Sequence, residues 1–167
     1  ETVSEEADSG AGAGIDTLDF SAVTRDLTFA VNAEGDVSVT DDQGNKLSAT
    51  NVEGLIGGTG ANTLDLSSYG EPVVINLLQE HSSVFRTLSN IDNVVGTIYD
   101  DTLIGSDQPN VLSGGGGNDT LQGGGAADTL TGGEGEDELW EIADADMVLT
   151  DNSFSMTLAS TSETTTD

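Results

Sequence analysis

Residues 114–122 read GGGGNDTLQ: four consecutive glycines, then Asn-Asp, then Thr-Leu-Gln. Similar nonapeptides stand directly before and after this stretch. They are GTIYDDTLI (96–104), GSDQPNVLS (105–113), GGGAADTLT (123–131) and GGEGEDELW (132–140). The five copies tile residues 96–140 without a gap. A flexible Gly-rich linker needs no fixed period, so this repetition predicts a regular structure with nine residues per unit.

Three positions of the nonapeptide are nearly constant. Glycine opens every copy. Position six is Asp101, Asn110, Asp119, Asp128 or Asp137, and position eight is Leu103, Leu112, Leu121, Leu130 or Leu139. If six turn residues precede a three-residue strand, the leucine points inward and its neighbours point outward. Eighteen residues then close one coil of a flattened solenoid. The sequence therefore predicts an all-β fold with a parallel β-roll (β-solenoid) over residues 96–140, flanked by additional β-strands.

The flanking sequence is also strand-like. Looser copies of the repeat occur at 11–19 and 57–65. Alternating apolar and polar residues predict further strands, and no segment has a helical period. These strands are expected at 27–31, 36–40 and 72–78, with two more within 147–160. We expect four parts: a strand-rich region (1–95), the β-roll (96–140), flanking strands (141–160) and a mobile polar tail (161–167).

Composition excludes several classes of function. The chain has 31 acidic residues against three basic ones, for a net charge of −28. This balance argues against nucleic acid and anionic membranes, which require clustered Lys and Arg. Cysteine is absent and His81 is the only histidine, so no HExxH zinc site or triad with a GxSxG serine exists, and we expect no enzyme activity. No apolar run predicts membrane insertion. Without a recognisable signal peptide, the chain is expected to be exported by another route or to be part of a longer protein.

The repeat itself suits a cation. Glycines let main-chain carbonyls approach a common centre, and the position-six carboxylate adds an anionic oxygen. A site built from oxygen alone favours Ca²⁺, whereas Mg²⁺ demands tighter octahedral geometry. One buried leucine per nine residues cannot offset the entropy of ordering those residues. Folding and Ca²⁺ binding are therefore expected to be coupled, with the repeats unfolded in the absence of the ion.

These nonapeptides resemble the haemolysin-type, or RTX, calcium-binding repeats of secreted bacterial proteins, whose consensus is GGxGxDxUx. GTIYDDTLIGSDQPNVLSGG (96–115) resembles the usual lead-in to such an array. In that family each ion lies between two turns 18 residues apart, on the same side of the roll.

The resemblance implies three ions in this chain and offers a position for a fourth. The first would be held by Asp101, Asp119 and the carbonyls of Thr97, Tyr99, Gly114 and Gly116. The second would be held by Asp119, Asp137 and the carbonyls of Gly115, Gly117, Gly132 and Glu134. The third would be held by Asn110, Asp128 and the carbonyls of Ser106, Gln108, Gly123 and Gly125, and is expected to be the weakest because Asn110 is neutral. Asp92 and Asn110 could hold the fourth. Asp16 and Asn62 are expected to be turn residues.

The resemblance also implies a biological role. The leading hypothesis is a calcium-binding structural module of a secreted, extracellular bacterial surface or matrix protein, such as an adhesin stalk or a self-assembling fibre whose subunits or repeats stack end to end. One alternative is the C-terminal secretion and folding domain of an exported hydrolase or toxin. Another is a carbohydrate- or ice-binding solenoid, for which the outward strand positions are too mixed to give strong support.

Overall fold

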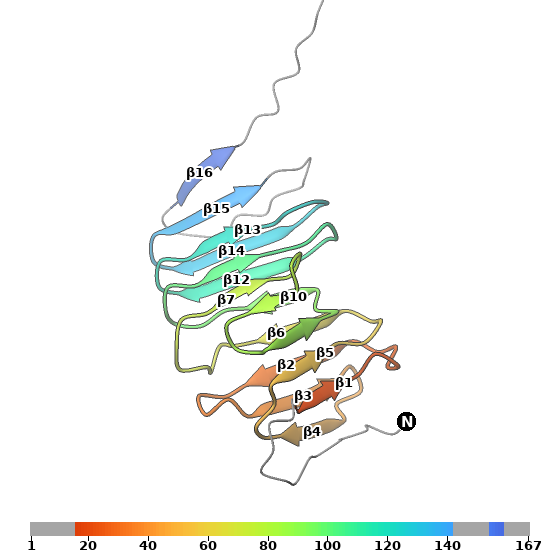
Figure 1. The fold of residues 1–167 in the computed structure, drawn as a ribbon. Coiled ribbons are helices and arrows are strands. Elements are labelled where there is room, and N and C mark those ends of the chain that lie inside the picture. The colour runs from red at the N-terminus through yellow and green to blue at the C-terminus, as the bar shows by residue number, and fades with distance from the viewer. Residues whose placement is uncertain (1–15, 142–153, 159–167) are drawn as a thin grey trace, which may run out of the picture.

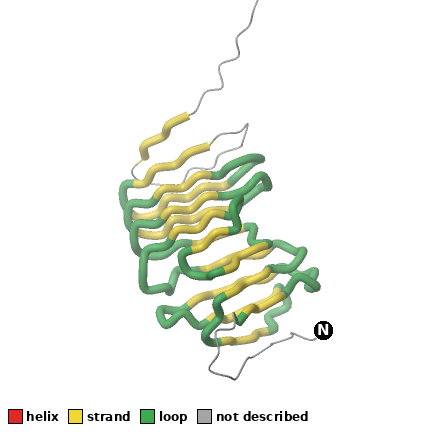
Figure 2. Tube along the Cα trace, viewed as in Figure 1, coloured by secondary structure: helices red, strands yellow, loops and turns green. Residues whose placement is uncertain are grey.

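The computed structural model describes residues 16–141 and 154–158, and every regular element in these segments is a β-strand. No helix in the described residues has the length and apolar character needed to cross a membrane. The strands are stacked along one direction of the molecule (Figure 1), and short strands alternate with turns throughout the stack (Figure 2). The all-β prediction is confirmed for this part of the chain.

Three sheets contain all of these strands. The first has the order β1-β5-β9, formed by β1 (Thr17–Asp19), β5 (Gly54–Ile56) and β9 (Thr87–Ser89). The second has the order β14-β12-β10-β6-β2-β3-β4, formed by β14 (Thr129–Glu134), β12 (Val111–Gly116), β10 (Asn93–Val95), β6 (Asn62–Asp65), β2 (Leu27–Val31), β3 (Val37–Asp41) and β4 (Lys46–Ala49). The third has the order β16-β15-β13-β11-β7-β8, formed by β16 (Phe154–Leu158), β15 (Asp137–Glu141), β13 (Thr120–Gln122), β11 (Thr102–Ile104), β7 (Val74–Asn76) and β8 (His81–Ser82).

Strand pairing is parallel except in β2–β3, β3–β4 and β7–β8. The chain thus passes through the sheets repeatedly in the same direction, and we call one such passage a rung. In the repeats, hydrogen-bonded partners on successive rungs lie 18 residues apart. The strands keep this register, since Leu103 pairs with Leu121 and Leu121 with Leu139. The parallel register agrees with the 18-residue coil expected from the sequence.

The upstream rungs are longer. Partners on successive rungs there lie between 28 and 37 residues apart. The rung of β1 to β4 lies in the first and second sheets, the rungs that begin with β5 and β9 pass through all three, and the later rungs use only the second and third. The second sheet nevertheless continues from β6 through β10 to β12, so strand pairing crosses the position after residue 95 where we had expected one region to end and another to begin.

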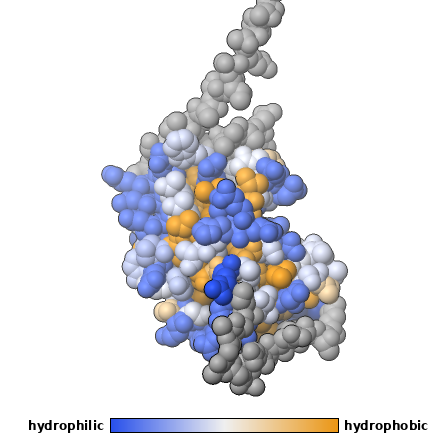
Figure 3. Space-filling view, in the orientation of Figure 1, coloured by the Kyte–Doolittle hydropathy of each residue, from blue (hydrophilic) through white to orange (hydrophobic). Residues whose placement is uncertain are grey.

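The position-eight leucines form a buried column. Leu103, Leu112, Leu121, Leu130 and Leu139 are each at most 1 % exposed. The column continues upstream through other apolar side chains, among them Val94, Ile75 and Leu64. Hydrophilic residues cover most of the face drawn in Figure 3, with smaller apolar areas between them. The core is thus one continuous apolar column running through the stack.

Strand boundaries differ slightly from those expected. The predicted strand at 27–31 coincides with β2, and that at 36–40 is shifted by one residue in β3. The strand expected at 72–78 is shorter, because the chain turns after β7 and leaves Leu78 56 % exposed. Three predictions fall partly or wholly outside the described residues: the loose copy at 11–19, the strands within 147–160 and the tail at 161–167. Of these, the structure describes β1 and β16, and β16 pairs in parallel with β15.

Candidate metal centre

The position-six side chains are buried in two columns. Asp101, Asp119 and Asp137 precede or begin strands of the third sheet, whereas Asn110 and Asp128 precede strands of the second. Each of these five residues is between 1 % and 3 % exposed. A buried carboxylate needs compensating partners, so the structure places four acidic groups where solvated turn aspartates would not lie.

One oxygen of each downstream carboxylate binds the preceding rung. The Asp101 N–H donates to Asp119 Oδ1 at 2.7 Å, and the Asp119 N–H donates to Asp137 Oδ1 at 2.9 Å. In the other column, the Asn110 N–H donates to Asp128 Oδ1 at 2.8 Å. The position-six side chains therefore join successive rungs as well as lining their turns.

The second oxygen of Asp119 has a different environment. Its Oδ2 atom is buried and has no hydrogen-bond partner among the described residues. A buried anionic oxygen without a donor is costly. This oxygen has the chemistry expected of a ligand for a hard cation.

Burial also changes the acidity of this column. It raises the pKa of Asp119 from 3.8 to about 7. The hydrogen bond from the Asp101 amide opposes this rise, and the negative charges of Asp101 and Asp137 add to it. Burial likewise raises the pKa of Asp101. Without a cation, a proton is therefore the species that best neutralises Asp119 near neutral pH.

This acidity predicts opposite pH effects with and without Ca²⁺. The folded-state pKa of Asp119 lies above its ordinary value of 3.8, so without metal the fold loses stability as the pH rises from about 4 toward 7. With Ca²⁺ present the proton competes with the ion, so the calcium concentration needed for folding rises as the pH falls below 7. Circular dichroism in EDTA should show more β-structure at about pH 5 than at about pH 7.5. Calcium titrations at the same two pH values should give a higher midpoint concentration at the lower pH. A midpoint independent of pH would contradict the prediction.

The first glycine of the repeat leaves room for the carboxylate. A Cβ on Gly114 would collide with Asp119 Oδ2 and would lie 2.6 Å from the Gly132 carbonyl oxygen. Gly132 has the same relation to Asp137 Oδ2, and a Cβ on Gly96 would lie 2.5 Å from Asp101 Oδ2. The recurrent glycine is therefore required by close approach of its own repeat's carboxylate.

Side chains alone do not complete a cation site. The described residues contain no group of three or more His, Cys, Asp or Glu side chains arranged to hold a metal, so main-chain carbonyls must supply the other ligands. Of the expected carbonyl donors, Thr97 and Ser106 each accept one amide hydrogen, from Gly116 at 3.0 Å and from Gly125 at 2.8 Å. A carbonyl oxygen has a second lone pair that can bind an ion.

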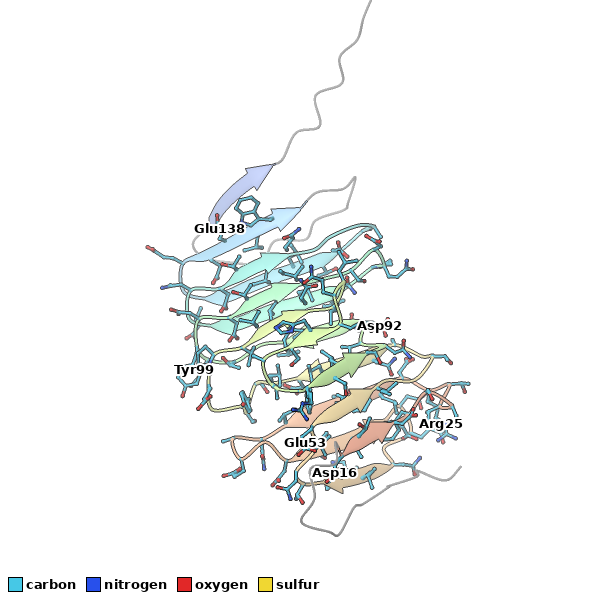
Figure 4. All side chains as sticks on the ribbon, in the orientation of Figure 1. Asp16, Arg25, Glu53, Asp92, Tyr99 and Glu138 are labelled. Atoms are coloured by element: carbon cyan, nitrogen blue, oxygen red, sulfur yellow. The ribbon has the colours of Figure 1, made fainter. Side chains whose placement is uncertain are left out.

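The remaining expected ligands lie in the same turns. Gly114, Gly123 and Gly132 are buried, Gly115, Gly116, Gly117 and Gly125 are half-buried, and Tyr99, Gln108 and Glu134 are exposed. The side chains of the last three residues thus face solvent, and only their carbonyls are candidates. Tyr99 and Asp92 are labelled on opposite sides of the stack in Figure 4, in agreement with two separate columns of turns.

Asp92 has other partners. Its Oδ2 accepts the Asn62 N–H at 2.8 Å, and its carbonyl accepts Asn110 Nδ2 at 2.6 Å. The Asn62 side chain in turn donates to the carbonyls of Gly58 and Gly60. This geometry favours a hydrogen-bonded junction between rungs over a fourth ion, and it gives Asn62 the turn role expected from the sequence.

Sequence reasoning missed the side chains of Thr97 and Ser106, which it named only as carbonyl donors. Both hydroxyls bind the position-six side chain of their own turn. The available signal was a hydroxyl residue at position two, where the three later copies have glycine.

Fold and site together define an acidic, mainly parallel β-protein with candidate oxygen-ligand cation sites in its turns. The model of the RTX calcium-binding nonapeptide repeat matches four copies in this chain, at residues 88–120 and 104–139. Residues 88–139 therefore carry RTX repeats, which bind Ca²⁺ and act as a structural calcium-binding module. No curated protein matches the chain in sequence.

Proposed function

We propose that residues 96–140 form a calcium-stabilised β-roll, and that its role is structural and non-catalytic. The buried Oδ2 of Asp119, which lacks a hydrogen-bond donor among the described residues, is the observation that carries this proposal. Ca²⁺ supplies the positive charge that this oxygen needs and joins rungs whose apolar contacts are few.

The three proposed ions use the ligand sets implied by the family resemblance. The Asp119–Asp137 site should bind most tightly, because it alone combines two carboxylates from turns that have glycine at position two. The Asp101–Asp119 and Asn110–Asp128 sites should be weaker, since the side-chain oxygens of Asp101 and Asn110 already accept hydrogen bonds. By analogy with other extracellular calcium modules, each site should have a Kd of roughly 10⁻⁴–10⁻³ M.

At the level of the organism, the proposed setting is the exterior of a bacterium, as part of a surface or matrix protein. RTX proteins are typically secreted, and rungs that depend on millimolar Ca²⁺ would stay unfolded until export. Strand β4 closes the described part of the second sheet and exposes Lys46. A lysine on an edge strand discourages pairing with another chain, which favours a stalk module over a fibre at this end.

Circular dichroism during a calcium titration tests the proposal. The spectrum should change cooperatively from partly unfolded to β-rich as Ca²⁺ rises through roughly 10⁻⁴–10⁻³ M, and EDTA should reverse the change. Magnesium at the same concentrations is the control and should have little effect. Complete β-structure in EDTA would contradict calcium-coupled folding.

Two further observations separate the biological alternatives. Light scattering on the calcium-loaded sample distinguishes a monomeric module from a stacking fibre subunit. A catalytic domain encoded beside this segment would instead support the secretion and folding domain of an exported hydrolase or toxin.

A further inference from the structure

Two of the five repeat turns differ from the others at position two. The turns at 96–101 and 105–110 have Thr97 and Ser106 there, whereas the turn at 114–119 has Gly115 with φ +111°. Few side chains adopt that backbone conformation, and a Cβ on Gly115 would also collide with the Thr97 carbonyl oxygen. The two kinds of turn are therefore not interchangeable.

In the first kind of turn, the residue at position two closes the loop. The Thr97 N–H donates to Asp101 Oδ2 at 2.6 Å, and the Thr97 hydroxyl donates to Asp101 Oδ1 at 3.1 Å. The same hydroxyl accepts the Tyr99 N–H at 3.0 Å. One residue thus satisfies both carboxylate oxygens and an amide within the turn.

The second turn repeats this arrangement. The Ser106 N–H and hydroxyl donate to Asn110 Oδ1 at 2.6 and 3.1 Å, and the hydroxyl accepts the Gln108 N–H at 3.1 Å. Two turns on opposite columns with different position-six residues therefore use the same three donor groups, although both Ser106 donors bind one oxygen and those of Thr97 bind two. Such local side-chain bonds are a recognised way of closing a turn without a ligand.

These two turns also bind the rungs before them. The Val73 N–H donates to Asp101 Oδ1 at 2.8 Å, and Asn110 Nδ2 donates to the Asp92 carbonyl at 2.6 Å. By contrast, Asp119 Oδ2 in the first glycine turn has no hydrogen-bond donor among the described residues. The change from hydrogen-bonded turns to turns that require a cation falls between residues 110 and 114.

We propose that the turns at 96–101 and 105–110 close without calcium, through the hydrogen bonds of Thr97 and Ser106, and form a platform on which the rungs of residues 114–140 assemble when Ca²⁺ binds. Stacked repeats contact only their neighbours, so a stable rung at one end lowers the cost of ordering the next. The proposal rests on the calcium dependence of residues 114–140 put forward above.

Hydrogen–deuterium exchange on the whole 167-residue chain tests this platform. In EDTA, the amides of Thr97 and Ser106 and of the strands at 102–104 and 111–113 should be protected, while amides across 118–138 exchange freely. Added Ca²⁺ should protect the second group. Rapid exchange of both groups in EDTA would overturn the platform even if Ca²⁺ later orders the whole array. Full protection of both groups in EDTA would instead overturn the proposed calcium dependence, and the platform with it.

A pair of variants identifies the groups responsible. T97A/S106A removes both hydroxyls but keeps the main-chain N–H bonds, and should speed exchange across 96–113 in EDTA by roughly tenfold. T102A/T120A removes two hydroxyls from half-buried strand positions and is the matched control, with exchange expected to stay within about twofold. Equal effects of the two pairs would show that the hydroxyls of Thr97 and Ser106 have no special role.

Discussion

Replacing Asp119 with asparagine should raise the calcium concentration needed for folding by roughly tenfold or more, since two of the three proposed sites lose a charged ligand. Asparagine keeps the shape of the side chain, and its Oδ1 can still accept the Asp101 N–H that Asp119 accepts at 2.7 Å. The change therefore removes the carboxylate charge and replaces Oδ2 with an NH₂ group, which cannot bind a cation. Calcium titration followed by circular dichroism measures the midpoint.

The same variant should have the opposite effect in EDTA. Burial raises the pKa of Asp119 to about 7, so at neutral pH without metal the ionised carboxylate destabilises the fold. The substituted asparagine carries no charge, and D119N in EDTA should therefore have more β-structure than the wild type at about pH 7.5 and a weaker dependence on pH. A variant destabilised under both conditions would show that Asp119 acts only through packing and hydrogen bonds.

Glu138→Gln is the matched control for this experiment. Glu138 lies in β15 beside Asp137 and is exposed. Glutamine at this position changes the net charge by the same amount as D119N, keeps the Glu138 main-chain bond to the Asp119 carbonyl, and removes no proposed ligand. Its calcium midpoint should stay within about twofold of the wild type, because exposed charges contribute little. An equal shift in both variants would point to a general effect of net charge.

Gly114→Ala should abolish calcium-induced folding of the repeats in the millimolar range. The added Cβ would collide with Asp119 Oδ2 and stand 2.6 Å from the Gly132 carbonyl oxygen. Asp119 is a ligand of the first and second proposed sites, and the Gly132 carbonyl is a ligand of the second. Neither atom can move without opening the turn. The calcium-dependent change in circular dichroism should therefore be lost, or displaced by roughly a hundredfold in concentration.

Gly116→Ala provides a control within the same run of four glycines. A Cβ at this position would meet only main-chain atoms of Ile98, at 3.6 Å or more, which is ordinary van der Waals contact. Alanine keeps the Gly116 carbonyl that the first site would use, so the calcium midpoint should change by no more than about threefold. If G114A and G116A behaved alike, loss of glycine flexibility would explain the result better than obstruction of the carboxylate.

Much of the repeat region could be predicted from the sequence, because its information is local. A glycine, an acidic residue and a leucine recur at fixed offsets, and strand alternation then dictates which side chain is buried. The 18-residue register and the buried leucines follow from this period. The oxygen-only ligands of the repeat likewise indicate Ca²⁺, in agreement with the match to RTX repeats.

Only the tertiary structure decided how the upstream rungs pair and which carboxylate oxygens accept hydrogen bonds. Asn62 and Asp92 are bonded across 30 residues, and Val73 and Asp101 across 28, so loops of unequal length separate partners that no period connects. The sequence placed Asp101 and Asp119 in equivalent positions, yet Thr97 donates a hydrogen bond to each oxygen of one carboxylate while Gly115 brings no hydroxyl to the other. A repeat specifies which residues are equivalent, but the donors around each oxygen depend on contacts between rungs and on one side chain that departs from the pattern.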